Sequence, residues 1–206
     1  MSSLGKGDIR EPFIEVTYPN GSSTTDMVFD RAEIIQGKEE YDTLPGSYDD
    51  NGEVEQLGIY LKDRNYNLTL ELHYYVYEKC DIITRSAKLV NSGNESVRLE
   101  RLMSMQLDLN ESDYELSFFN GAWAREMNRS RIPIRAGKYV NEAVTGTSSN
   151  RANPFFMIGR SSTTEDYGEC YGFNLIYSGN HYEAVETGMC DMTRIVAGIK
   201  PQSFSY

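Results

Sequence analysis

The sequence predicts an all-β fold, a large antiparallel β-sandwich with few short helices. The run 66–78 (YNLTLELHYYVYE) alternates in the period of two that is typical of a strand with one buried face. Fifteen tyrosines and many threonines and valines suit pleated surfaces better than helices. The best helical pattern, in residues 31–42, is interrupted by Gly37 and has thin apolar spacing.

Taken in order, the β-rich runs begin with residues 66–78, whose expected buried face carries Leu68, Leu70, Leu72, Tyr74 and Val76. Residues 80–90 and 95–109 flank the turn signal Asn91–Asn94 (NSGN), and this arrangement predicts a hairpin. Further strands are expected at 171–180, 181–186 and 193–199, the first with Tyr171, Phe173, Leu175 and Tyr177 on one face. Without a repeat or linker, we expect a single domain over residues 1–206.

The charge of the chain argues against two classes of partner. The net charge is −11 and the pI is about 4.7, whereas nucleic-acid and anionic membrane surfaces attract basic proteins. No apolar run approaches the ~20 residues of a membrane span. The lead sequence lacks a signal-peptide core, and three cysteines without paired spacing fit a reducing compartment. We therefore expect a cytoplasmic protein that binds neither nucleic acid nor membrane, while neutral ligands such as sugars remain possible.

The motifs of common catalytic sites are missing from the sequence. It holds no GxSxG elbow, P-loop, GxGxxG or CxxC. His73 and His181 stand apart from any metal-ligand grouping, so we expect no metal and no cofactor. The carboxylates around Glu111–Glu115 and Glu165–Glu169 are expected to be solvated loop charges. No residue of the chain is predicted to be catalytic.

The single tryptophan, Trp123, stands among small residues in FFNGAWAREMNR (118–129). A buried core or interface anchor is one interpretation, and a platform that stacks on the apolar face of a sugar is another. Gly121 and Ala122 before it indicate that another backbone or surface approaches closely.

Several stretches resemble a known family. GDIREP (7–12), LPGSYDD (44–50), DIITRS (81–86), GAWARE (121–126), NPF (153–155) and GECYGFNLIYSGN (168–180) occur in order. Together they resemble the N-terminal β domain of bacterial α-galactosidases of glycoside hydrolase family 36, over about residues 5–206.

The resemblance implies a β-supersandwich that precedes a (β/α)₈ catalytic barrel. Such enzymes cleave terminal α-galactosides, for example melibiose and raffinose, with retention of configuration. The two reactive aspartates belong to the barrel, which these 206 residues do not contain, so we expect the chain alone to be inactive. The implied partners are that barrel, an α-galactoside, and further copies of the enzyme in a homo-oligomer, as a tetramer when full length.

The resemblance also implies that loops of this domain reach a sugar. The candidate substrate-binding residues are Tyr48, Asp49, Asp50, Trp123 and Arg125. The alternatives are a free-standing carbohydrate-binding module and a purely structural assembly domain. Where relatives read SSHQHNPF, this chain has Asn150, Arg151 and Ala152 in place of the HQH segment, so both family histidines are missing.

Overall fold

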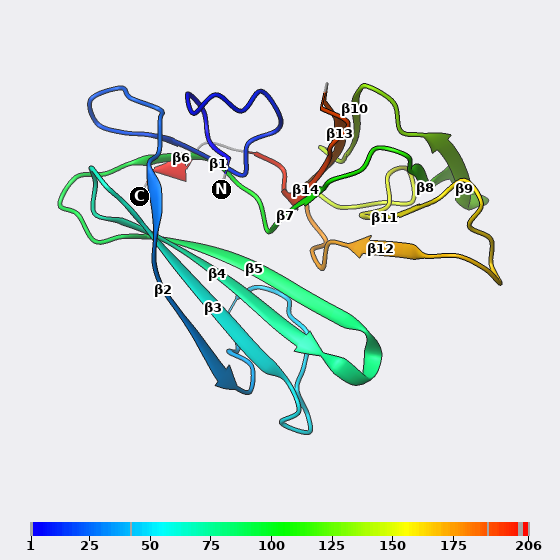
Figure 1. The fold of residues 1–206 in the computed structure, drawn as a ribbon, viewed down its shortest axis with the longest axis horizontal. Helices are drawn as coiled ribbons and strands as arrows, with labels where there is room; N and C mark the ends of the chain where they lie inside the picture. Colours follow the sequence, from blue (N-terminus) through cyan, green and yellow to red (C-terminus); the bar gives the residue numbers. More distant parts are fainter. Residues whose placement is uncertain (1, 42, 189, 202–203, 206) are drawn as a thin grey trace. The chain divides into compact units, whose positions relative to one another are not determined.

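The structure, a computed structural model, describes residues 1–206 except Met1, Asp42, Met189, Gln202, Ser203 and Tyr206 (Figure 1). Its contacts divide the chain into two compact units: unit 1 comprises Met1–Met105 with Pro201–Tyr206, and unit 2 comprises Gln106–Lys200. The predicted all-β sandwich class is confirmed. In the described residues the one helical element is the 3₁₀ turn η1 (Glu78–Cys80). The assignment of residues 1–206 to a single domain stays a prediction.

Unit 1 contains two sheets. The larger is a meander of consecutive antiparallel strands: β2 (Met27–Gln36), β3 (Glu55–Asp63), β4 (Leu68–Tyr77) and β5 (Ile82–Asn91). The smaller has the order β1 (Ile14–Thr17), β6 (Arg98–Leu102) and β15 (Phe204–Ser205). In Figure 1 the four strands of the larger sheet fan out as long ribbons from a common region.

The buried face of β4 changes partway along the strand. Leu68, Leu70 and Leu72 are buried as predicted, but Val76 is 40% exposed and Tyr75, on the opposite face, is 1% exposed. The ladders to β3 and β5 run without a register shift, so the strand does not rotate its faces. The prediction for the second half of the strand was wrong because a loop covers the opposite face there.

The predicted hairpin around Asn91–Asn94 was also wrong. β5 pairs with β4, whereas β6 pairs with β1 and β15, so the NSGN segment connects two different sheets. The turn itself forms, since the Asn91 side chain accepts a hydrogen bond from the Gly93 amide and donates one to the Glu95 carbonyl. The run 95–109 is not one strand but two, β6 and β7 (Met105–Leu109).

The helical pattern at 31–42 proved to be the second half of a strand. β2 extends to Gln36, and Gly37 then turns the chain with a φ of +96°, a conformation that glycine adopts readily. Residues 38–41 continue as a loop, and Asp42 lies outside the described residues.

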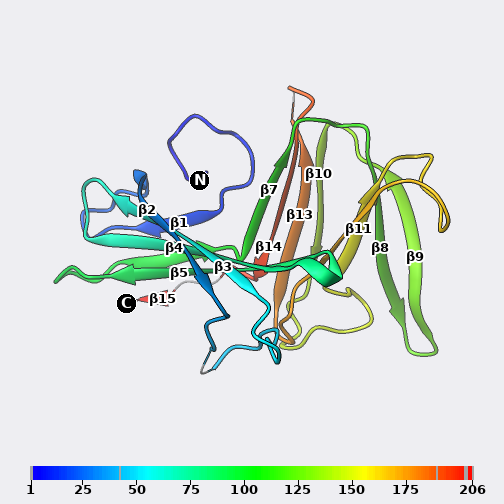
Figure 2. The same cartoon turned by 60° about the horizontal axis from the view of Figure 1, so that its bottom comes forward.

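Unit 2 also contains two sheets (Figure 2). One has the order β10 (Gly137–Glu142), β13 (His181–Thr187), β14 (Thr193–Ile199) and β7. The other has the order β12 (Cys170–Asn174), β11 (Phe155–Gly159), β8 (Glu115–Ala122) and β9 (Arg125–Pro133). The expected strands at 181–186 and 193–199 are confirmed as β13 and β14, whereas the one at 171–180 ends early, at Asn174.

The core of unit 2 is built from both of its sheets. Leu116, Phe156 and Ile158 from one sheet, and Val185 and Ile195 from the other, are at most 2% exposed. The described part of the chain holds no helix of the length and hydropathy needed to cross a bilayer.

Candidate functional site

The loop between β2 and β3, Gly37–Val54, carries three of the predicted residues. Its ends are joined because the Gly37 amide donates to the Val54 carbonyl at 2.8 Å. The side-chain amide of Gln36 donates to the carbonyls of Gly52 and Val54 at 3.0 and 3.2 Å. The loop is therefore closed at its base.

The three predicted residues in this loop differ in their surroundings. Tyr48 is 82% exposed. Asp49 has a structural role, since its carboxylate accepts hydrogen bonds from the amides of Glu53 and Val54 at 2.9 and 3.4 Å. The exposed carboxylate of Asp50 has no hydrogen-bond or ion-pair partner in the part of the chain that the structure describes. Tyr48 and Asp50 are thus available to a ligand, and Asp49 shapes the turn.

The other two predicted residues lie at the tip of the β8–β9 hairpin, where Trp123 and Ala124 form the turn. The hairpin register shifts between Asn120 and Ala122, and a β-carbon on Gly121 would lie 2.1 Å from the Arg125 carbonyl oxygen. The close backbone approach predicted from Gly121 is therefore confirmed. Ala124 has a φ of +59°, so this tip is held in a conformation uncommon for alanine.

Trp123 is 92% exposed, so the interpretation of this residue as a core anchor was wrong for this chain. A hairpin tip extends beyond its sheet, and a side chain there has few neighbours to bury it. Arg125 is exposed as well, while its carbonyl accepts a hydrogen bond from the Asn128 side chain at 2.6 Å. The exposed indole is available to a sugar ring or to a protein surface.

The segment that departs from the family pattern supports this hairpin. The Asn150 side-chain amide donates to the Ala122 carbonyl at 3.2 Å, next to Trp123. Asn153 donates to the Phe119 carbonyl through both its side chain and its main chain, at 3.0 and 3.2 Å. Asn150, at a position where relatives have the segment HQH, therefore contacts the backbone of the hairpin that carries a candidate residue.

The candidate residues form two groups, one in each unit. Tyr48, Asp49 and Asp50 share the Gly37–Val54 loop of unit 1, and Trp123 and Arg125 share the hairpin tip of unit 2.

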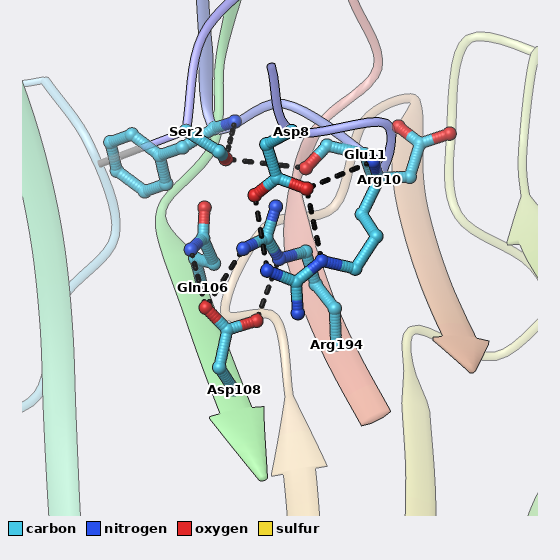
Figure 3. Close-up of polar contacts among 8 residues, drawn as sticks. Ser2, Asp8, Arg10, Glu11, Gln106, Asp108 and Arg194 are labelled. Atoms are coloured by element: carbon cyan, nitrogen blue, oxygen red, sulfur yellow. Dashed lines mark hydrogen bonds and ion pairs between the residues drawn. The ribbon is translucent and has the colours of Figure 1, made fainter. Parts of the chain in front are cut away.

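Other carboxylates in the chain have structural partners. Figure 3 shows Asp108 of β7 facing Arg194 of β14, with nitrogen–oxygen distances of 2.6 and 2.9 Å. Gln106 donates to the same carboxylate at 3.1 Å. Because the Arg194 side chain is only 3% exposed, Asp108 compensates a buried charge.

Glu183 of β13 is a buried carboxyl group whose pKa is raised. It is 2% exposed, and burial raises its pKa to about 7, while a hydrogen bond from Asn141 at 2.8 Å acts in the opposite direction. His181 on the same face is fully buried, and burial lowers its pKa while the charge of Glu142 opposes this. Glu183 and Asn141 are paired across β13 and β10. This cluster could not be predicted from the sequence, because the pattern of HYEAVE (181–186) is that of an ordinary strand.

The acidic clusters of unit 2 lie at the surface. Glu111 and Glu115 form ion pairs with Arg160 and Arg131. Glu165 lies 3.8 Å from Arg129 and its side chain is 88% exposed. Over the described ranges, no group of three or more His, Cys, Asp or Glu side chains is placed to hold a metal ion.

Sequence reasoning missed the residues that hold the Gly37–Val54 loop. Tyr75 and Tyr77 of β4 and Thr84 and Ser86 of β5 point at this loop and bond to it. A signal was available in β4: Thr69, Glu71, His73, Tyr75 and Tyr77 place polar and hydroxyl groups at every second position, on the face that was expected to be solvent-exposed.

Comparison with known proteins identifies relatives over the whole chain. The model of the glycosyl hydrolase family 36 N-terminal domain matches residues 1–206. The α-galactosidase AgaA of Geobacillus stearothermophilus is 36% identical over 99% of this chain and 28% of its own length. Alpha-galactosidase 2 of Hypocrea jecorina is 32% identical over 98% of this chain and 27% of its own.

Solved structures agree with these sequence matches. The α-galactosidase from Lactobacillus brevis superposes with a TM-score of 0.96 at 39% identity, over all of this chain and 28% of that one. A variant of AgaA in complex with raffinose gives 0.95 at 34% identity, over 99% of this chain and 30% of that one. The chain thus spans between a quarter and a third of the length of these relatives.

Proposed function

Because the chain belongs to the family of glycosyl hydrolase family 36 N-terminal domains, we propose that it is the non-catalytic part of an α-galactosidase that shapes the substrate entrance. The full-length enzyme would hydrolyse terminal α-galactosides such as melibiose and raffinose with retention, using carboxylates of a catalytic barrel. In this proposal the domain packs on that barrel and takes part in assembly of a homo-oligomer, as a tetramer when full length.

The observation that carries the proposal is the state of the Tyr48–Asp50 segment. An unpaired carboxylate and an 82% exposed phenol stand on a loop that is closed at its base. Carboxylates accept charge-assisted hydrogen bonds from sugar hydroxyls, and aromatic rings cover the apolar face of a sugar. A loop that is closed at its base has less conformational freedom to lose on binding than an open one. These properties suit recognition of a neutral, hydroxyl-rich ligand.

The test is the variant Asp50→Ala in the full-length protein, assayed with raffinose. A lost charge-assisted hydrogen bond is worth roughly 1.5–3 kcal/mol, so kcat/KM should fall by about 10- to 150-fold with Tm unchanged. Asp166→Ala, which removes an exposed carboxylate from a loop of unit 2, is the matched control. Unchanged kcat/KM in Asp50→Ala would remove this loop from the active site.

The 92% exposure of Trp123 favours one alternative, a free-standing carbohydrate-binding module. Isothermal titration of the chain alone with galactose, melibiose and raffinose separates the two functions. Millimolar or tighter binding, abolished in Trp123→Ala, supports the module. An absence of heat with all three sugars supports a domain that contacts sugar only within the larger enzyme.

A further inference from the structure

We propose that a set of hydroxyl groups on one face of β4 and β5 positions the Tyr48–Asp50 segment for substrate, an inference that rests on the proposed function. We call this set the hydroxyl clamp: Tyr41 and Ser47 of the loop with Tyr75, Tyr77, Thr84 and Ser86 of the sheet. Its members are positioning residues, since they contact the loop and act on the sugar through Tyr48 and Asp50.

Ser47 makes the contact closest to the candidate residues, because it directly precedes Tyr48. Its hydroxyl accepts a hydrogen bond from the Tyr77 hydroxyl at 2.6 Å and lies 3.3 Å from the Thr84 hydroxyl. Tyr77 ends β4 and Thr84 lies near the start of β5, so two strands fix one serine.

Tyr41 makes the second contact. Its hydroxyl lies 2.8 Å from the Tyr75 hydroxyl and also bonds to Ser86. Tyr75 is 1% exposed, and burial raises the pKa of its phenol, so it keeps its proton and can serve as a donor. The Lys38 ammonium lies 4.7 and 4.9 Å from the centres of the Tyr41 and Tyr75 rings and adds cation–π attraction.

The sheet side of the clamp is built on an unbroken ladder. Tyr75 pairs with Thr84, and His73 pairs with Ser86, so these side chains share one face without a register shift. Tyr74, on the other face of β4, instead accepts a hydrogen bond from Arg85 at 2.8 Å. The clamp therefore belongs to one face of a rigid element, which is a precise support for a binding group.

The loop is held before and after the clamp as well. At its start, the Glu39 amide donates to Gln56 Oε1 at 3.2 Å, and Gln56 Nε2 lies 3.1 Å from Nδ1 of the buried His73. At its end, Asp49 bonds to the amides of Glu53 and Val54. Between these anchors the side chains of Tyr48 and Asp50 remain exposed.

If the hydroxyl clamp positions the loop, removal of one of its hydroxyl groups should lower kcat/KM more than it lowers stability. A displacement of about 1 Å in a substrate-orienting group can lower a rate by about 100-fold. Removal of one hydroxyl leaves the ladder and the loop ends intact, so we expect the full-length Tyr77→Phe protein to lose about tenfold in kcat/KM with raffinose at unchanged Tm. Tyr74→Phe, which removes a hydroxyl from the opposite face of the same strand, should retain the wild-type value.

A double-mutant cycle tests whether the clamp acts through the loop. In the Asp50→Ala background, Tyr77→Phe should cause a smaller fold-loss in kcat/KM than it does in the wild type, because one of the two positioned groups is absent. Ser47→Ala should cause the same loss in kcat/KM as Tyr77→Phe. The double variant Ser47→Ala/Tyr77→Phe should lose no more kcat/KM than either single variant. Full additivity of Tyr77→Phe and Asp50→Ala would overturn the positioning role.

Amide hydrogen exchange of residues 44–53 provides a readout independent of activity. Tyr77→Phe and Ser47→Ala should accelerate exchange there, and Tyr74→Phe should not. Unchanged exchange in both clamp variants overturns the clamp, whatever the kinetics show. Faster exchange with normal kcat/KM in Tyr77→Phe overturns positioning, whereas normal kcat/KM in Asp50→Ala refutes the proposed function of the loop instead.

Discussion

Replacement of Glu183 by glutamine is expected to stabilise the protein at alkaline pH and to leave its stability nearly unchanged at acidic pH. The carboxyl group is 2% exposed, and its one described partner, Asn141, donates a single hydrogen bond at 2.8 Å. Glutamine keeps the size and an acceptor for Asn141, but it carries no charge that must be buried.

The pKa of Glu183 sets the sign and the size of the effect. Burial raises it from the ordinary 4.5 to about 7, so the folded protein binds the proton more tightly than the unfolded chain. The stability from this proton is full below pH 4.5, declines as the pH rises, and is lost above pH 7. At ~1.4 kcal/mol for each pH unit, the loss amounts to roughly 3 kcal/mol.

The contribution of His181 to stability has the opposite pH dependence, so its effect must be distinguished from that of Glu183. Burial lowers its pKa from 6.5, so its contribution is present above pH 6.5 and is lost as the pH falls. Both the wild type and Glu183→Gln keep His181, so the difference between the two proteins reports mainly on Glu183.

The assay is urea unfolding followed by far-ultraviolet circular dichroism at pH 5, 7 and 9. Circular dichroism is preferable because the single tryptophan is 92% exposed and reports little on the core. Glu186→Gln, on the same strand, controls for the loss of one negative charge. If the wild type and Glu183→Gln give parallel stability curves from pH 5 to 9, the carboxyl group does not titrate as argued.

Two further predictions concern the β8–β9 hairpin. Trp123→Ala should change the free energy of unfolding by less than about 0.5 kcal/mol, because the indole is 92% exposed. A loss of several kcal/mol measured by calorimetry would contradict the exposed placement of Trp123. Gly121→Ala should destabilise the protein by roughly 1–3 kcal/mol in urea titrations, because its β-carbon would meet the Arg125 carbonyl at 2.1 Å. Wild-type stability in Gly121→Ala would mean that the bulge can rearrange freely.

The fold class could be predicted from the sequence because alternation and β-branched or aromatic content are local properties. The pairing of strands could not, as the segment Asn91–Asn94 illustrates. A turn signal predicts that the chain reverses or bends at that point, but it does not predict which sheet the next strand joins. β5 pairs with β4, the strand that precedes it, whereas β6 pairs with β1 near the start of the chain, so the strands on either side of this turn belong to different sheets.

In the candidate site, too, the residue types could be predicted from the sequence, but their surroundings depend on contacts with residues distant in the chain. The sequence singled out Asp49 and Asp50 together, but only the structure separates a turn-forming carboxylate from a free one. Trp123 was ambiguous because a bulky aromatic suits a core as well as a surface, and exposure depends on neighbours distant in the chain. The burial of Tyr75 likewise depends on the loop that covers it.

The hydrogen bond between Gln56 and His73 determines which tautomer the histidine adopts. Gln56 Oε1 must be the atom facing the Glu39 amide, so the amide nitrogen of Gln56 donates to Nδ1 of His73. The neutral ring consequently carries its hydrogen on Nε2, which lies 3.4 Å from the Glu71 carboxylate. The orientation of a single side-chain amide thus links a loop backbone to the tautomer of a buried imidazole.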